Sequence, residues 1–217
     1  MILLSTKKLN VKIKSALYKS GIDIFEAPMI KTRVINFQWP KIEDGIIITS
    51  STALKGILKH SEYRTIIKTP FFCVGTSTKV KLLGLGLNVV ECEYSAKDLA
   101  NTIIKKYSNK TFNYFCGRQR LNIIDNLFKK NSVDLSFCEV YETKETSVKI
   151  ESSFENVLFF SPSAVKSYAK NNSFDSKTCF SWGSTTAKEI AKYSDNYFVS
   201  KKPELNSLIL LIKNTLK

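Results

Sequence analysis

Hydroxyl side chains follow two apolar runs of the sequence, each at the point where a helical pattern begins. The run Val157 to Phe160 ends in Ser161-Pro162-Ser163, and the run Ile46 to Ile48 ends in Thr49-Ser50-Ser51. A strand, a tight polar turn and a helix together aim backbone N–H groups and hydroxyls at an anion beyond the strand's carboxyl end. The sequence therefore predicts two matching sites for anionic groups, which would use Ser50, Ser51, Ser161 and Ser163.

Two further apolar runs end in a glycine that is followed by hydroxyls. Gly75 precedes Thr76-Ser77-Thr78, and Gly183 precedes Ser184-Thr185-Thr186. Serine and threonine favour helix starts because their oxygens accept hydrogen bonds from N–H groups that have no partner in the helix. We expect these hydroxyls to cap the helices that follow. Capping and anion binding use the same geometry. Each hydroxyl could therefore bind an anion or could serve only as a helix cap.

Several other kinds of chemistry lack the residues they need. His60 is the only histidine, and the five cysteines are scattered without a Cys-x-x-Cys pair, which argues against a zinc site or a Cys–His nucleophile. The glycine-rich loops that bind nucleotides are also missing. We expect no metal, no cofactor and five reduced thiols, most of them buried. Chemistry would then depend on positioning, hydrogen bonds and a weak acid such as tyrosine.

The chain of 217 residues carries a formal net charge of +14. A polyanionic partner would explain this charge, and so would a lysine-rich composition, and the sequence leaves both open. The lysines are spread along the chain and arginine is rare, so no nucleic-acid partner is expected. No apolar run is long enough to span a membrane, and the short apolar start does not resemble a signal peptide. We expect a cytoplasmic protein without membrane contact.

Short apolar runs alternate with helical patterns from one end of the chain to the other. This alternation predicts an α/β fold with mainly parallel sheets. Local signals mark the helix ends: Gly21 as the residue after a helix, Ser95-x-x-Asp98 as a capping box, and Pro203 as a first helical residue.

The two halves of the chain resemble each other. Ser163 to Lys166 matches Thr52 to Lys55 at an offset of 111 positions, and Gly183 to Thr186 matches Gly75 to Thr78 at 108. We interpret this as a duplicated α/β domain, although short α/β units can also look alike by chance. Two such domains with facing strand ends would form a cleft lined by hydroxyls and helix N-termini, which suits carboxylates.

Seven short motifs, in order along nearly the whole chain, resemble those of the uroporphyrinogen-III synthase family. They are Ile48-Thr49-Ser50 with Ala53, Phe72 to Gly75 with Thr78, Gly86 to Glu91, Phe115-Cys116-Gly117-x-x-Arg120, Val140-Tyr141-x-Thr143, Phe159 to Val165, and Gly183-x-Thr185-Thr186-Ala187.

This resemblance implies a cofactor-free enzyme that closes linear hydroxymethylbilane to uroporphyrinogen III while inverting ring D. The substrate's eight carboxylates agree with the basic chain. The family fold implies two similar doubly wound domains joined by a two-stranded antiparallel linker. Here one domain would combine residues 1–30 with 146–217, the other would span 38–135, and 31–37 and 136–145 would be the linker strands. We expect a monomer; a transient contact with hydroxymethylbilane synthase remains open.

The resemblance also implies roles for single residues. Tyr141 aligns with the tyrosine proposed to help the ring D hydroxyl leave, although it could be only a packed strand residue. Trp182 and Ser5-Thr6-Lys7 depart from the family pattern near the expected cleft wall. A non-catalytic two-lobed protein that binds a polycarboxylate is the alternative function. The residues expected to bind substrate are Ser50, Ser51, Gly75, Thr78, Ser161, Ser163, Gly183 and Thr186.

Overall fold

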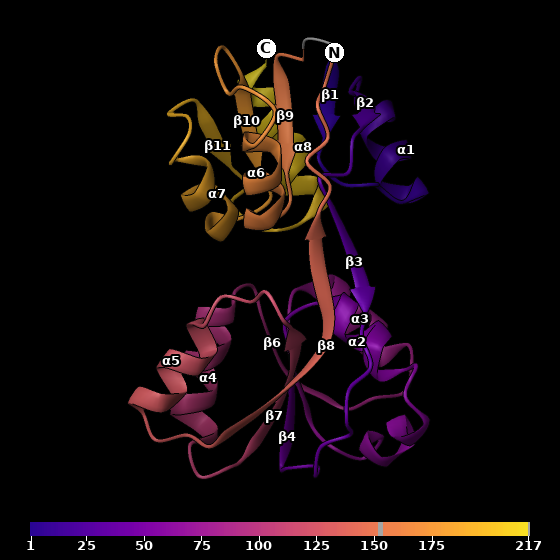
Figure 1. Cartoon of the computed structure of the whole chain (residues 1–217), viewed down its shortest axis with the longest axis vertical. Coiled ribbons are helices and arrows are strands. Elements are labelled where there is room, and N and C mark those ends of the chain that lie inside the picture. The colour runs from indigo at the N-terminus through magenta and orange to yellow at the C-terminus, as the bar shows by residue number, and fades with distance from the viewer. Residues whose placement is uncertain (152–153, 217) are drawn as a thin grey trace. The chain divides into compact units, whose positions relative to one another are not determined.

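The structure, a computed structural model, describes residues 1–151 and 154–216 and contains two compact units. Unit 1 comprises Met1–Lys31 and Lys144–Lys217, and unit 2 comprises Thr32–Thr143. The chain therefore leaves unit 1 after its first thirty residues and returns to it later (Figure 1). Both units are α/β with mainly parallel sheets, as the alternation of strands and helices predicted.

Unit 1 has a five-stranded sheet in the order β11-β10-β9-β1-β2. All four neighbouring pairs are parallel. One hydrophobic cluster around Leu4, Phe159 and Val165 and another around Leu3, Leu17 and Phe180 fill its two faces. The elements are β1 (Ile2–Ser5), α1 (Val11–Lys19), β2 (Asp23–Glu26), β9 (Asn156–Phe159), α6 (Pro162–Ala169), β10 (Thr178–Ser181), α7 (Ser184–Ile190), β11 (Tyr197–Val199) and α8 (Leu205–Thr215).

Unit 2 has a six-stranded sheet in the order β3-β8-β7-β4-β5-β6. The five strands from β8 to β6 are parallel. Its elements are β3 (Ile30–Val34), β4 (Gly45–Ile48), α2 (Ser51–Ile57), the 3-10 helix η1 (Ser61–Ile66), β5 (Phe71–Val74), α3 (Thr76–Leu83), β6 (Val89–Glu93), α4 (Ala96–Tyr107), β7 (Phe112–Gly117), α5 (Ile123–Lys130) and β8 (Leu135–Glu145).

The edge strand β3 pairs with the long strand β8. The Ile35 N–H donates to the Val140 oxygen at 3.1 Å, and the Thr146 N–H donates to the Met29 oxygen at 3.0 Å. One partner's number falls as the other's rises, so this part of the ladder is antiparallel. β3 and β8 are also the segments in which the chain passes from one unit to the other.

The repeat in the sequence appears in the sheets in an exchanged form. Strands β4, β5 and β6 correspond to β9, β10 and β11, while β1 and β2 correspond to β7 and β8. Under this correspondence the order β11-β10-β9-β1-β2 becomes β6-β5-β4-β7-β8, which is the parallel part of the other sheet. Each unit thus combines the first βαβ segment of one repeat with the remainder of the other repeat.

Most of the local signals lie where the sequence predicted them, and some do not. Gly21 has a φ of +76° just after α1, and the Ser95 oxygen accepts a hydrogen bond from the Asp98 N–H at the start of α4. Pro203 is not the first helical residue, because α8 starts at Leu205 with Glu204 as its N-cap. All five cysteines are free, and all but Cys92 are buried. Within residues 1–151 and 154–216, no helix is long and apolar enough to cross a membrane.

Candidate functional site

The polar residues of unit 2 meet at the carboxyl end of its parallel strands. Ser50 follows β4 as the N-cap of α2, where its oxygen accepts a hydrogen bond from the Thr52 N–H at 3.2 Å. Ser51, the first residue of that helix, is half-buried. Gly75 follows β5 with a φ of +83°, a conformation that favours glycine, and its N–H donates to the Glu93 oxygen at 2.8 Å.

The corresponding edge of unit 1 has the same arrangement. Ser161 follows β9 as the N-cap of α6 and accepts a hydrogen bond from the Ala164 N–H at 3.3 Å. Ser163 lies in the first turn and is half-buried. Gly183 precedes α7, and its N–H donates to the Ser181 hydroxyl at 3.3 Å. At the carboxyl ends of the strands in each sheet, one helix is therefore capped by a serine and another begins at a glycine.

The two glycine-led helices correct the expectation that Thr76-Ser77-Thr78 and Ser184-Thr185-Thr186 act as caps. In α3 and α7 the N-cap is the glycine itself, and no side chain caps the first turn. Thr78 and Thr186 occupy equivalent places in these helices and are only 5% and 4% exposed. Their hydroxyls thus have little accessible surface, while the first-turn N–H groups of both helices donate no hydrogen bond to a capping side chain.

Tyr141 lies on β8 beside the serine-capped helix of unit 2. Its phenol lies close enough to the Ser50 hydroxyl to interact with it, so two residues selected from distant parts of the sequence meet in one unit. Burial raises the pKa of Tyr141 above its ordinary value, and the interaction with the Ser50 hydroxyl offsets part of this effect. The phenol is therefore protonated at neutral pH and can donate a proton or a hydrogen bond.

A second phenol, which the sequence analysis did not select, lies toward the same carboxyl end of the strands. The Tyr114 hydroxyl on β7 lies 2.9 Å from the Thr49 hydroxyl at the end of β4. Tyr114 is 4% exposed, and burial raises its pKa well above the ordinary range. The alternation of residues along β7 was the one available signal, because it places Tyr114 on the face opposite Phe115.

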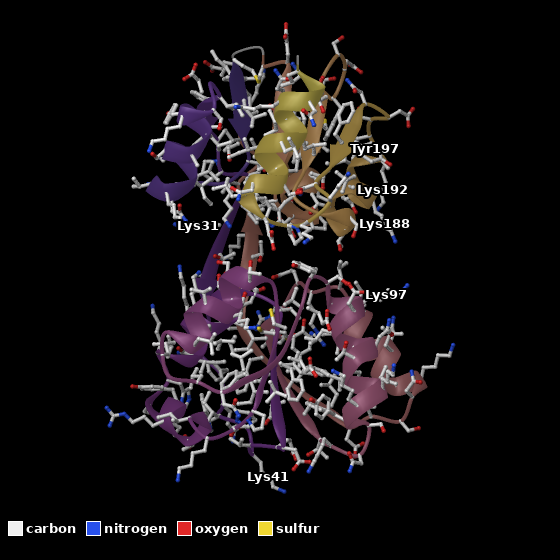
Figure 2. The ribbon with its side chains drawn as sticks, turned by 180° about the vertical axis from the view of Figure 1, so that it is seen from behind. Lys31, Lys41, Lys97, Lys188, Lys192 and Tyr197 are labelled. Carbon is white, nitrogen blue, oxygen red and sulfur yellow. The ribbon has the colours of Figure 1, made fainter. Side chains whose placement is uncertain are left out.

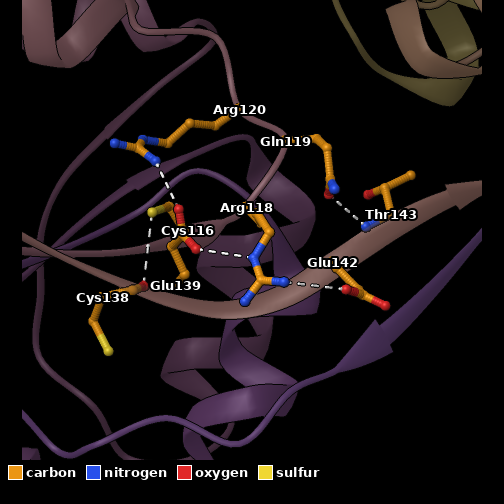
Figure 3. A network of polar contacts seen from close by, with 8 residues as sticks. All are labelled: Cys116, Arg118, Gln119, Arg120, Cys138, Glu139, Glu142 and Thr143. Atoms are coloured by element: carbon orange, nitrogen blue, oxygen red, sulfur yellow. Dashed lines mark hydrogen bonds and ion pairs between the residues drawn. The ribbon is translucent and has the colours of Figure 1, made fainter.

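The loop after β7 is fastened to β8 by three consecutive residues (Figure 3). The Arg118 guanidinium pairs with Glu139 at 3.1 Å and with Glu142 at 3.5 Å. The Gln119 side-chain oxygen accepts a hydrogen bond from the Thr143 N–H at 2.8 Å. Arg120 pairs with Glu139 at 3.5 Å and stacks over the exposed ring of Phe137 at 4.4 Å. Of these residues, Arg120 and Thr143 belonged to motifs recognised in the sequence.

The two departures from the family pattern pack together in unit 1. The Lys7 ammonium lies 5.4 Å from the centre of the Phe160 ring, and Phe160 lies 5.2 Å from Trp182. Lys7 follows β1, Phe160 follows β9 and Trp182 follows β10, so they border the same strand ends as Ser161. This aromatic pair with a cation beside it can contact a flat, acidic molecule.

Exposed, positively charged side chains occur on both units. Lys31, Lys188 and Lys192 are exposed on unit 1, and Lys41 and Lys97 are exposed on unit 2 (Figure 2). All four arginines of the chain belong to unit 2. In the described part of the chain, no three His, Cys, Asp or Glu side chains are grouped so as to hold a metal ion.

Comparison with known proteins provides independent information about the chain. Residues 11–210 match the family model described as uroporphyrinogen-III synthase HemD. The uroporphyrinogen-III synthetase structure from Helicobacter pylori 26695 has a TM-score of 0.72 at 16% identity, with 99% of each chain covered. A mutant uroporphyrinogen III synthase from the extremely thermophilic bacterium Thermus thermophilus has a TM-score of 0.64 at 12% identity, covering 100% of this chain and 98% of that one. No curated protein sequence matches the chain. The structural matches show a shared fold.

Proposed function

Because the chain belongs to the uroporphyrinogen-III synthase family, we propose that it closes hydroxymethylbilane to uroporphyrinogen III, with inversion of ring D and loss of water. It is an enzyme of porphyrin biosynthesis, and its substrate is a small molecule. The observation that carries the mechanism is the interaction of the Tyr141 phenol with the Ser50 hydroxyl at the carboxyl end of the unit 2 sheet.

In this proposal Tyr141 assists the departure of the ring D hydroxyl group. A hydroxide ion is a poor leaving group, and a hydrogen bond or proton from a nearby acid lowers the barrier to its departure. The raised pKa of Tyr141 keeps the phenol in its donor form across the neutral range. The Ser50 hydroxyl would orient the phenol. It would also donate a hydrogen bond that stabilises the negative charge developing on the phenol oxygen.

Carboxylate binding would use the strand ends of both sheets. We assign Ser50, Ser51, Gly75, Thr78, Ser161, Ser163, Gly183 and Thr186 to this role. Helix N-termini carry a partial positive charge and N–H donors, so each can hold a carboxylate. At the helices led by Gly75 and Gly183 the backbone would make the contact, because Thr78 and Thr186 are buried. Binding of this kind needs no cofactor.

The proposal also covers the protein's cellular location, its oligomeric state and its partners. We propose that it acts in the cytoplasm as a monomer and receives its unstable substrate through transient contact with hydroxymethylbilane synthase. The proposal includes no nucleic-acid partner. A two-lobed binding protein without catalysis is not favoured by the family match.

The deciding experiment supplies hydroxymethylbilane to the purified protein and separates the uroporphyrin isomers after oxidation. Spontaneous closure gives isomer I, so enrichment of isomer III is the expected result, and isomer I alone would reject the function. Tyr141→Phe should lower kcat roughly 100-fold, within the usual contribution of a general acid. Tyr18→Phe, which alters an exposed tyrosine of α1, is the control. Full activity of Tyr141→Phe would remove the acid role and leave the family function intact.

A further inference from the structure

Tyr141 departs from the regular alternation of its strand. Cys138 and Val140 belong to the hydrophobic cluster beneath α2, and Tyr141 packs against that same cluster. Consecutive residues of a regular strand point to opposite faces of the sheet. Val140 and Tyr141 therefore share a face only because the backbone is irregular at this point.

The irregularity is a bulge in the pairing of β7 with β8. Cys116 pairs with Glu139, whereas the next residue of β7, Gly117, pairs with Tyr141, so Val140 is an extra residue in β8. The carbonyl group of Val140 is not left unpaired, because the Ile35 N–H donates to it at 3.1 Å. Bulges are enriched beside active sites, where they redirect a side chain.

The redirected ring lies against Gly117. A Cβ atom at Gly117 would be 2.6 Å from Cζ of Tyr141 and 2.9 Å from its hydroxyl oxygen, which is closer than real contacts allow. The φ of Gly117 is outside the left-handed region, so its backbone would accept alanine. The neighbouring ring is what requires a glycine at this position.

The surrounding contacts keep Gly117 and Tyr141 together. The Arg118 N–H donates to the Tyr141 carbonyl oxygen at 2.9 Å. The side chains of Arg118 and Gln119 bind β8 on both sides of Tyr141, at Glu139, Glu142 and Thr143 (Figure 3). The loop that begins at Gly117 is thus fastened along the strand that carries the phenol.

We propose that Gly117 is a positioning residue for Tyr141: together with the bulge at Val140 it forms a bare backbone surface on which the ring lies with its hydroxyl at Ser50. Only the expected effect on kcat rests on the proposed function. The position of the Tyr141 ring does not depend on that function, and the 13Cζ signal of the tyrosine measures it separately.

The first test replaces Gly117 with alanine in the full chain. The variant should shift the tyrosine 13Cζ signal of Tyr141, which is assigned by its loss in Tyr141→Phe. A displacement of about 1 Å can cost on the order of 100-fold in rate, so kcat should fall while KM stays within about threefold. An unchanged signal together with an unchanged kcat would overturn the proposal.

Gly45→Ala is the matched control. A Cβ at Gly45 would be 2.8 Å from the Phe112 ring, an equally severe clash, but at the opposite end of the parallel sheet. It should lower the melting temperature while the Tyr141 signal and the kcat of the folded protein are retained. If Gly45→Ala alters both to the same extent as Gly117→Ala, the effect is general destabilisation and the proposal fails.

The double variant Gly117→Ala/Tyr141→Ala removes the ring that the new methyl group would meet. Relative to Tyr141→Ala alone it should lose no further stability or activity, and it should fold even if Gly117→Ala does not. An additional loss would show that Gly117 acts through another residue. If the wild-type protein makes no isomer III, the proposed function fails, and the 13Cζ signal still decides whether Gly117 places the ring.

Discussion

Gly56 of α2 lies so close to Val140 of β8 that a Cβ atom on the glycine would come within 3.0 Å of both the Val140 Cβ and its carbonyl oxygen. The helix therefore packs directly on the bulged residue. Because Ser50 is the N-cap of the same helix, this packing also sets how near the Ser50 hydroxyl lies to Tyr141.

Gly56→Ala should destabilise the protein, although alanine is the better helix former by about 1 kcal/mol. The methyl group would press on backbone, and overpacking of this kind costs about 1–3 kcal/mol. Urea unfolding measures the change. Lys55→Ala, at an exposed position of the same helix, should remain within about 0.5 kcal/mol of wild type. A more stable Gly56→Ala variant would contradict the packing.

Ser50→Ala should affect both α2 and Tyr141. Loss of the cap costs about 1 kcal/mol, and loss of the Ser50 interaction that lowers the phenol's pKa should let that pKa rise further. An NMR titration of Tyr141 and the isomer III rate check these effects. Ser161→Ala removes the equivalent cap of α6; it should have a similar stability cost and a higher KM, with the Tyr141 titration unaltered. Equal titrations in Ser50→Ala and wild type would disprove the contact.

The protein should lose stability in alkaline solution. Burial raises the pKa of Cys73, Cys116 and Cys179 from 9.0 to about 12, and that of Cys138 to about 11. The native state then holds these protons more tightly than the unfolded chain. Stability is therefore complete below about pH 9 and falls as the pH rises toward 12, by up to about 1.4 kcal/mol per pH unit for each group. Unfolding curves at pH 8, 9.5 and 11 test this, and a constant stability would refute it.

Thiol labelling should distinguish Cys92 from the other four cysteines. Cys92 is half-buried, while the rest are buried. At pH 8 an aromatic disulfide reagent should modify one thiol of the native protein rapidly and five after denaturation. Cys92→Ser should abolish the rapid phase. Two or more rapid thiols in the wild-type protein would mean that a buried strand is more accessible than its packing indicates.

The sequence was sufficient for the local structure, because strands, helices and most helix ends are determined by residues close to one another. Ser95 with Asp98 and Gly21 are examples. The cap predictions failed at Gly75 and Gly183 because hydroxyls in the first turn suggest capping even when a glycine occupies the N-cap itself.

The exchange of strands and the contacts of Tyr141 could not be predicted from local patterns. A repeat fixes which strands correspond but not which copy each joins, since that choice depends on pairings between residues such as Leu4 and Val157. The sequence selected Ser50 and Tyr141 separately. Their contact depends on one extra residue in β8 and on the absence of side chains at Gly117 and Gly56. Neither the extra residue nor the need for these two glycines could be predicted from a pattern along the chain.

The exchanged repeats have a consequence for how the protein is made on the ribosome. Unit 2 lies within one continuous segment and can be completed while synthesis continues. Strands β1 and β2 emerge first, yet the neighbour of β1, β9, begins only at Asn156. At about 5–20 residues per second, Leu3 and Leu4 wait on the order of ten seconds for the strand that buries them. Strands β1 and β2 are therefore made before unit 2 but acquire their neighbours after it, and nascent-chain chaperones would have that time to bind them.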